Sequence, residues 1–284
     1  MMKRASCCFV MIFTLALMAF TSTVSYGFSF DVDRFTVKSG ASTFVDEFDD
    51  GVEPPSGPSG SSTYSVPVGS FSANAESGGV LNMNSNDAAI LGDEVAIGVG
   101  LSDNTYDFIS GSGGFVETKL SFPGGFTNNS FFDMDIASQP WESNNPNEAV
   151  ELGIGMDTPG VISAFFSAYV DDGLTEVDID ISEIDITGLL GATTDLTMRL
   201  DISAANVVTA SLDIGSNGTF DVLMLGSHTL TFPGGKPYKA GFGAGESIEA
   251  VPEPTTVALL GIGLAGLAGA EVRRRQKKRA VGKS

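Results

Sequence analysis

Hydrophobic and polar residues alternate along most of the middle of the chain. The clearest alternating runs are residues 116–122, 150–156, 162–170, 196–202 and 208–214. A period of two sends successive side chains to opposite faces of a β-strand, so one face meets a core and the other meets water. Turn-forming sequences rich in Asn, Asp, Gly and Pro separate the runs, and no helical period occurs between them. The pattern predicts an all-β fold, an antiparallel β-sandwich.

One alternating run changes phase. Within residues 176–187, the apolar positions are odd up to Ile181 and even from Ile184 onwards. A slip of one residue reverses the face that each following side chain takes. The sequence therefore predicts a β-bulge or a break at Ser182 and Glu183, where the phase changes.

The N-terminal segment has the layout of a secretory signal peptide. Two basic residues precede an uncharged apolar stretch, and small residues follow at Ser25 and Gly27. We predict a signal peptide over residues 1–27, cut near Gly27 by signal peptidase, and a β-sandwich domain over residues 28–249. The apolar stretch is short for a membrane-spanning helix, which makes a permanent N-terminal anchor the weaker alternative.

The C-terminal segment predicts a membrane helix followed by a cationic stop. Residues 257–270 contain only Val, Ala, Leu, Ile and Gly, a length near the lower limit of about 17–25 residues for a spanning helix. We predict a transmembrane helix over residues 255–272. The membrane-stop residues that follow are Arg273, Arg274, Arg275, Lys277, Lys278 and Arg279. Basic residues stay on the cytoplasmic side, so the rest of the protein is expected on the outer side.

The same segment resembles the PEP-CTERM sorting tail. The motif residues are Val251, Pro252, Glu253 and Pro254, followed by the Gly- and Leu-rich helix and the arginines. We expect residues 250–284 to form this tail, with Glu271, an acid directly before the arginines, as its departure from the pattern. The resemblance implies an inner-membrane intermediate processed by an exosortase, and then a place at the cell surface or in an exopolysaccharide matrix. A plain C-terminal anchor is the alternative.

Charge excludes one class of function. The predicted sandwich carries 33 acidic and only six basic residues, and the whole chain has a formal net charge of −20. Nucleic-acid binding needs a basic surface, so we expect no nucleic-acid partner. Calcium or another divalent cation would be a natural counterion of such a chain.

Three stretches of the sandwich resemble the concanavalin A-like, laminin-G-like jelly rolls of exported bacterial proteins. They are the opening Asp-Glu-Phe-Asp-Asp-Gly at residues 46–51, the strand-like segment 78–83 and the late hairpin 196–220. The resemblance covers most of the sandwich and implies a jelly-roll topology.

One predicted strand suggests an enzyme. Glu176, Asp178 and Asp180 resemble the Glu-x-Asp-x-Glu strand of laminarinase-type retaining glycosidases, whose first Glu is the nucleophile and whose last is the acid/base. Such chemistry needs two carboxyl groups about 5–5.5 Å apart, and the shorter Asp180, or Glu183 beyond the phase change, fits that separation poorly. Sugar sites also need aromatic platforms, and Trp141 is the single tryptophan. We favour the interpretation that these acids lie on the solvent-exposed face of a strand and are not catalytic.

Metal and nucleophile chemistry find little support. Cys7 and Cys8 are the only cysteines and both lie in the predicted signal peptide, so the mature chain has no thiol. The single histidine, His228, cannot form a His-rich metal site, and we expect a plain strand or turn residue.

A calcium loop is an alternative to a simple hairpin turn. Its oxygens would come from Asp213, Asn217 and Asp221, with Gly218 at the bend. An Asn-Gly turn explains the same residues. We expect no cofactor, with calcium as the one alternative.

These observations lead to one function hypothesis with two alternatives. The leading hypothesis is an exported, non-enzymatic surface or matrix protein that binds carbohydrate. The alternatives are an extracellular glycosidase that uses Glu176, Asp178 and Asp180, and a purely structural component of the exopolysaccharide matrix. A concave groove that holds these acids beside Trp141 or a tyrosine would favour the enzyme.

Overall fold

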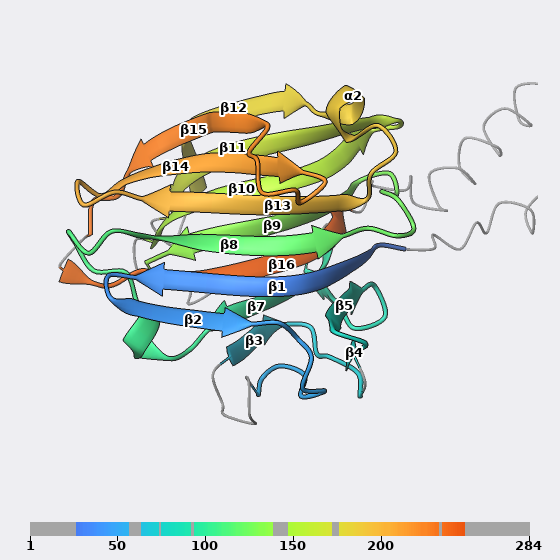
Figure 1. Cartoon of the computed structure of the whole chain (residues 1–284), viewed down its shortest axis with the longest axis horizontal. Helices are drawn as coiled ribbons and strands as arrows, with labels where there is room; N and C mark the ends of the chain where they lie inside the picture. Colours follow the sequence, from blue (N-terminus) through green and yellow to red (C-terminus); the bar gives the residue numbers. More distant parts are fainter. Residues whose placement is uncertain are drawn as a thin grey trace, which may run out of the picture.

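Two antiparallel sheets pack face to face as a β-sandwich (Figure 1). The computed structural model describes residues 27–56, 64–73, 75–91, 94–138, 147–171, 176–232 and 235–247. The architecture confirms the all-β prediction. Four of the five alternating runs fall within a strand, and the fifth, 116–122, ends one residue beyond β8 (Gly114–Ser121). The predicted transmembrane helix and almost all of the predicted signal peptide lie outside the described residues. Within those ranges, no helix is both long and apolar enough to cross a membrane.

Sheet I has the strand order β15-β14-β13-β8-β1-β5-β4, and β2 also pairs with β1. Its strands are β1 (Ser29–Ser39), β2 (Ser42–Asp46), β4 (Glu76–Ser77), β5 (Val80–Asn84), β8 (Gly114–Ser121), β13 (Asp195–Ile202), β14 (Val207–Ile214) and β15 (Val222–Thr229). β8 pairs with β13 on one side and with β1 on the other, so the sheet joins both halves of the chain.

Sheet II has the strand order β12-β11-β10-β9-β16-β7-β3, and β6 also pairs with β7. Its strands are β3 (Tyr64–Val68), β6 (Ala89–Leu91), β7 (Glu94–Leu101), β9 (Ser130–Ala137), β10 (Asn147–Thr158), β11 (Val161–Asp171), β12 (Glu176–Asp185) and β16 (Lys239–Ser247). The short helices η2 (Asn104–Tyr106) and α2 (Thr187–Leu190) lie in connections.

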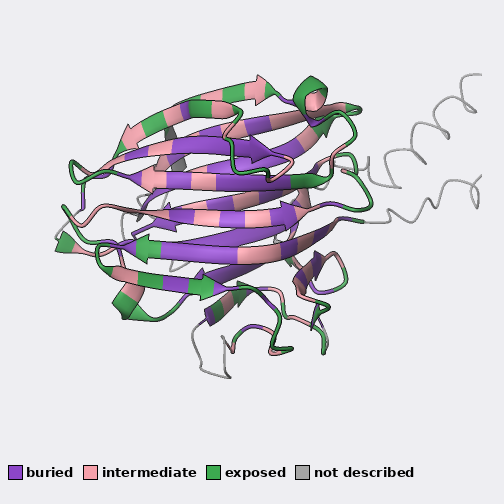
Figure 2. Ribbon diagram, in the orientation of Figure 1, coloured by how far each residue is buried: buried purple, intermediate pink, exposed green. Residues whose placement is uncertain are grey.

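Aromatic rings from both sheets form the centre of the core. Phe35 of β1 lies 4.8 Å from Phe242 of β16 between ring centroids, and Phe242 stacks on Phe132 of β9 at 6.2 Å. Phe30 of β1 contacts Phe132 at 5.6 Å. Figure 2 shows buried residues concentrated in the central strands, and exposed residues on β2, β12 and β15. Such rings bury large apolar areas, which makes them a main source of the attraction between the sheets.

One end strand of sheet I closes the edge of the sandwich. In β15, a register irregularity places three residues opposite the single Ala210 of β14. The bulge brings Gly226 against Phe166 of β11, where an added Cβ would lie 2.1 Å from the ring. A glycine is therefore required at this crossing, because no side chain fits between β15 and the buried ring.

The β12 bulge lies at a different residue from the predicted one. Ser182 and Glu183 pair with Phe166 and Phe165 of β11 without interruption, whereas the irregularity leaves Ile179 without a partner. The predicted position was wrong because Ile181 was read as a core residue, although 65% of it is exposed. Ala164 and Phe166 of the neighbouring strand β11 are buried in the core. The slip in β12 occurs nearer the beginning of that strand.

Candidate functional site

The sequence-predicted catalytic acids lie on β12, an end strand of sheet II. The backbones of Glu176, Asp178 and Asp180 pair with β11, and the bulge falls between Asp178 and Asp180. The side chains of these three acids, and all of Trp141, lie outside the described residues. Their catalytic role stays a prediction.

The predicted calcium loop forms a tight turn between β14 and β15. The carboxylate of Asp213, which is 3% exposed, accepts the amides of Asn217 at 3.1 Å and Gly218 at 2.7 Å. Asp221 accepts the amide of Ile214 at 2.9 Å. These bonds satisfy backbone donors of the turn, and calcium binding there stays a prediction. Among the residues with assigned positions, no group of three or more His, Cys, Asp or Glu is arranged to hold a metal ion.

A buried carboxylate connects the two sheets at one end of the sandwich. Glu148 of β10 is 3% exposed. Its Oε1 lies 2.9 Å from Nε2 of His228 in β15, and its Oε2 accepts the amide of Thr231 at 2.9 Å and its hydroxyl at 2.5 Å. The hydroxyl of Tyr238 also donates to Oε2. His228 therefore belongs to a polar cluster between the sheets.

The hydrogen bonds of Glu148 outweigh its burial. Burial alone would raise the pKa of the carboxyl, but donors from Thr231, Tyr238 and His228 together lower it below its usual value. The pKa of Tyr238 is raised by burial and by its bond to Glu148. The arrangement stabilises an ionised carboxylate inside the protein. We interpret it as a structural contact that holds β10 against β15.

The outer face of sheet II carries a second group of acids, which the sequence analysis did not identify. In β9, Phe132, Met134 and Ile136 enter the core, so the alternate residues Phe131, Asp133 and Asp135 lie on the outer face. The register pairs these three with Gly245, Gly243 and Gly241 of β16. An added Cβ would lie 2.7 Å from Oδ1 of Asp133 at Gly243, and 2.6 Å from Oδ1 of Asp135 at Gly241. The β9 side chains thus lie across a strip of glycine backbone.

Two aromatic rings lie beside these acids. The ring of Phe131 reaches over Gly245, where an added Cβ would be 2.5 Å from Cζ. The ring of Phe165 in β11 occupies the place of a side chain at Gly153, with Cζ 2.0 Å from an added Cβ. Gly153 pairs directly with Asp133. Both rings extend along the sheet surface next to the carboxyl groups, because glycine leaves room for them.

The acids of this face hold their protons unusually strongly. Burial raises the pKa of Asp135 to about 7, with repulsion from Asp133 adding to it and the Gly241 amide opposing it. Burial likewise raises the pKa of Asp133 to about 6, helped by Glu94 of β7 and opposed by a hydrogen bond with Glu151 of β10. Oδ1 of Asp135 is closed to solvent and has no hydrogen-bond partner. A pair of carboxyl groups with raised pKa values beside aromatic rings is typical of a functional site.

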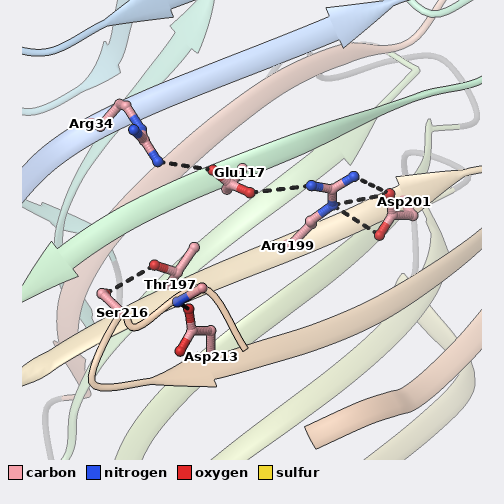
Figure 3. Close-up of polar contacts among 8 residues, drawn as sticks. Arg34, Glu117, Thr197, Arg199, Asp201, Asp213 and Ser216 are labelled. Atoms are coloured by element: carbon pink, nitrogen blue, oxygen red, sulfur yellow. Dashed lines mark hydrogen bonds and ion pairs between the residues drawn. The ribbon is translucent and has the colours of Figure 1, made fainter. Parts of the chain in front are cut away.

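The outer face of sheet I has the opposite character. Glu117 of β8 binds Arg34 at 3.2 Å and Arg199 at 3.3 Å, and Arg199 also binds Asp201 at 2.7 Å (Figure 3). The guanidinium of Arg199 lies 3.9 Å above the ring centroid of Phe115. This face is a closed ladder of opposite charges, so the acids of sheet II are the better candidate site.

The sequence held one signal for this site. Asp133 and Asp135 alternate with Phe132, Met134 and Ile136, and Gly241-x-Gly243-x-Gly245 repeats glycine with the same period. Glycine at alternate positions of a strand marks a close approach to its backbone. That the two segments are neighbours, although more than a hundred residues apart, is decided by the fold.

Comparison with known proteins identifies the C-terminal segment. Residues 250–275 match the family model described as a PEP-CTERM protein-sorting motif. This motif indicates a secreted protein that is processed by an exosortase and destined for the cell surface. No curated protein matches the chain.

Two solved structures are similar to the chain at 12% sequence identity. One is a native glycosidic hydrolase, with a TM-score of 0.35 over 58% of this chain and 70% of the other. The second comes from work on endo-acting O-glycanases that prominent members of the human gut microbiota express to initiate mucin breakdown. It has a TM-score of 0.37 over 78% of this chain and 64% of the other. Similarity at this level carries no argument about activity.

Proposed function

We propose that this protein displays a non-enzymatic, carbohydrate-binding β-sandwich at the cell surface or in an exopolysaccharide matrix. Its sorting tail delivers the sandwich, and the outer face of sheet II binds the sugar. Any calcium would belong to the turn at Asp213, Asn217 and Asp221.

The arrangement of Phe131 and Phe165 around Asp133 and Asp135 carries this proposal. Sugar rings offer an apolar C–H face and a rim of hydroxyl groups. Aromatic rings extended along a sheet can stack on the first, while the carboxyl groups hydrogen-bond to the second. The strip of glycine backbone lets a chain of sugars approach the sheet closely.

A glycan-array screen of the full chain in detergent, with and without calcium, tests the proposal. Phe131→Ala and Phe165→Ala are expected to lower binding at least tenfold, because each removes a stacking surface. Phe115→Ala on sheet I is the matched control and is expected to bind like the unaltered protein. Full binding by both sheet II variants would contradict this site, and absence of all binding would favour the purely structural matrix role.

A second candidate function, glycoside hydrolysis, is favoured by one observation. Asp135, with a pKa raised to about 7, lies on the same face as Asp133, and such a pair can divide the roles of proton donor and carboxylate. If this function holds, Asp135→Asn should lower the release of reducing ends more than a hundredfold and leave binding intact. Glu176→Gln in the same assay tests the β12 assignment. No release from any polysaccharide would exclude both.

The proposed route to the surface includes an inner-membrane intermediate. The predicted helix 255–272 would hold it, and the basic residues 273–279 would stop its transfer. Deleting residues 273–279 is expected to prevent trimming and display, as followed by mass spectrometry of surface material. Unaltered display would contradict the intermediate.

A further inference from the structure

We infer that the outer face of sheet II selects an uncharged, hydroxyl-rich polysaccharide and excludes anionic ones. This inference rests on the proposed function, because it names the ligand class of the same face. It depends on which charged groups the fold places there and on what each already contacts.

Acidic side chains outnumber basic ones on the described part of this face. They are Glu94 of β7, Asp133 and Asp135 of β9, Glu151 of β10, and Glu183 and Asp185 of β12. Asp133 exchanges a hydrogen bond with Glu151 and is repelled by Glu94. Asp133 is close enough to Glu94, Glu151 and Asp135 for these carboxyl groups to affect one another, so a further anion in the same place would be repelled as well.

The one base on the described part of this face is already occupied. Lys239 lies at the beginning of β16, and its Nζ binds Asp107 Oδ1 at 2.8 Å and Asn104 Oδ1 at 2.8 Å. It also donates to the carbonyl of Ser102 at 3.4 Å. Proteins recognise carboxylate, sulfate and phosphate groups with Arg or Lys. Of the other described Lys and Arg residues, Arg34, Lys119 and Arg199 belong to the ladder on sheet I. Lys38 lies on β1 of that same sheet, and Lys236 precedes β16.

The hydrogen-bonding groups of the site suit hydroxyl groups. Asp133 and Asp135 are partly exposed on this face, and an ionised carboxyl group accepts hydrogen bonds. A sugar hydroxyl can donate such a bond, whereas a carboxylate or sulfate cannot. Where Asp133 or Asp135 keeps its proton, it donates to a second hydroxyl in return. Phe131 and Phe165 then contact the apolar face of a neutral sugar ring.

The test uses pairs of polymers that differ only in charge. Several neutral polysaccharides are each compared with their own carboxymethylated form, with the full chain in detergent immobilised at pH 7.5. At low salt, binding of the neutral form should be at least tenfold tighter. The difference should shrink in 0.5 M salt, because salt screens repulsion between exposed charges.

Variants locate the discrimination on the face. The double variant Asp133→Asn with Asp135→Asn should bring the paired polymers within about threefold of each other, whereas Glu117→Gln on sheet I should leave the ratio unchanged. Circular dichroism checks that each variant is folded, and Glu151→Gln serves as a second variant if the double one is not. Equal or tighter binding of the carboxymethylated forms would overturn the inference and leave the proposed function standing. Failure of every neutral and charged polymer to bind would overturn the proposed function itself.

Discussion

The two outer faces of this sandwich use carboxyl groups in opposite ways. On sheet I, Glu117 lies between Arg34 and Arg199 within salt-bridge distance of both. On sheet II, Asp133 and Asp135 lie beside other acids, and their pKa values are raised. Carboxyl groups therefore stabilise one face through ion pairs, whereas on the other face burial and repulsion oppose their ionisation.

This difference indicates that the outer face of sheet II is not optimised for stability. Two acids next to each other at half-buried positions lower the stability of the fold at neutral pH, and asparagine would fit the same positions without that cost. Groups that reduce stability are often retained where a ligand uses them. The comparison between the faces leads to four predictions, from the largest expected effect to the smallest.

The largest effect is expected between the faces, at Glu148. Glu148→Ala should lower the free energy of unfolding by about 3 kcal/mol, because it leaves Thr231, Tyr238 and His228 without their shared acceptor. Its lowered pKa means that this contribution is present above the unfolded value near 4.5 and is lost as pH falls through the folded value. Urea titrations at pH 7 and pH 3 measure the difference. Tyr238→Phe, which removes one hydrogen bond, is the control and should cost about 1 kcal/mol.

Removing an acid from sheet II should stabilise the protein. Because the pKa of Asp135 is raised from 3.8 to about 7, the folded chain holds a proton that the unfolded chain releases. The stability that this proton confers is full below pH 3.8 and is lost as pH rises through 7. Asp135→Asn escapes that loss, so it should gain about 1–3 kcal/mol at pH 8 and close to nothing at pH 4. Equal effects at both pH values would show that the raised pKa of Asp135 is not the cause.

Removing an acid from sheet I should have the opposite sign. Glu117→Gln leaves Arg34 and Arg199 facing each other without their common partner. The side chain of Glu117 is 15% exposed, so the loss should be about 1–2 kcal/mol at pH 7. Thermal unfolding beside Asp135→Asn gives a direct test of the comparison. If both substitutions shift the midpoint in the same direction, the contrast between the faces is wrong.

The smallest effect is expected at the exposed end of the ladder. The side chain of Arg34 is 40% exposed and makes one bond to Glu117. Arg34→Ala should therefore lower stability by about 0.5 kcal/mol or less, and the effect should fade in 0.5 M salt. Chemical denaturation at two salt concentrations measures it. A loss comparable to that of Glu117→Gln would mean that the ladder depends on Arg34 more than its exposure indicates.

Sequence reasoning correctly found the strands but misjudged one part of β12. The period of two was sufficient for β8, β10, β11, β13 and β14, because each has one face in the core. In β12, Ile179 and Ile181 are apolar yet 51% and 65% exposed. The assumption that alternating apolar residues face the core failed there, because an end strand has less core to cover.

The candidate site was largely beyond sequence reasoning. Glu148 and His228 are 80 positions apart, and no local pattern connects them. Asp133 and Asp135 were visible as alternating acids, but so were many other acids of this chain. Their distinction comes from the neighbouring strands, which add glycine on one side and Phe165 and Glu151 on the other.

The sequence by itself determined the class of fold and the sorting of the protein, because alternation and the C-terminal motif are local patterns that act wherever they occur. Only the tertiary structure decided which carboxyl groups are paired with a base and which face one another. That outcome depends on strand order and register, which bring residues from distant parts of the chain within a few ångströms. The strength of a charge interaction follows from that separation and from burial, neither of which a linear pattern contains.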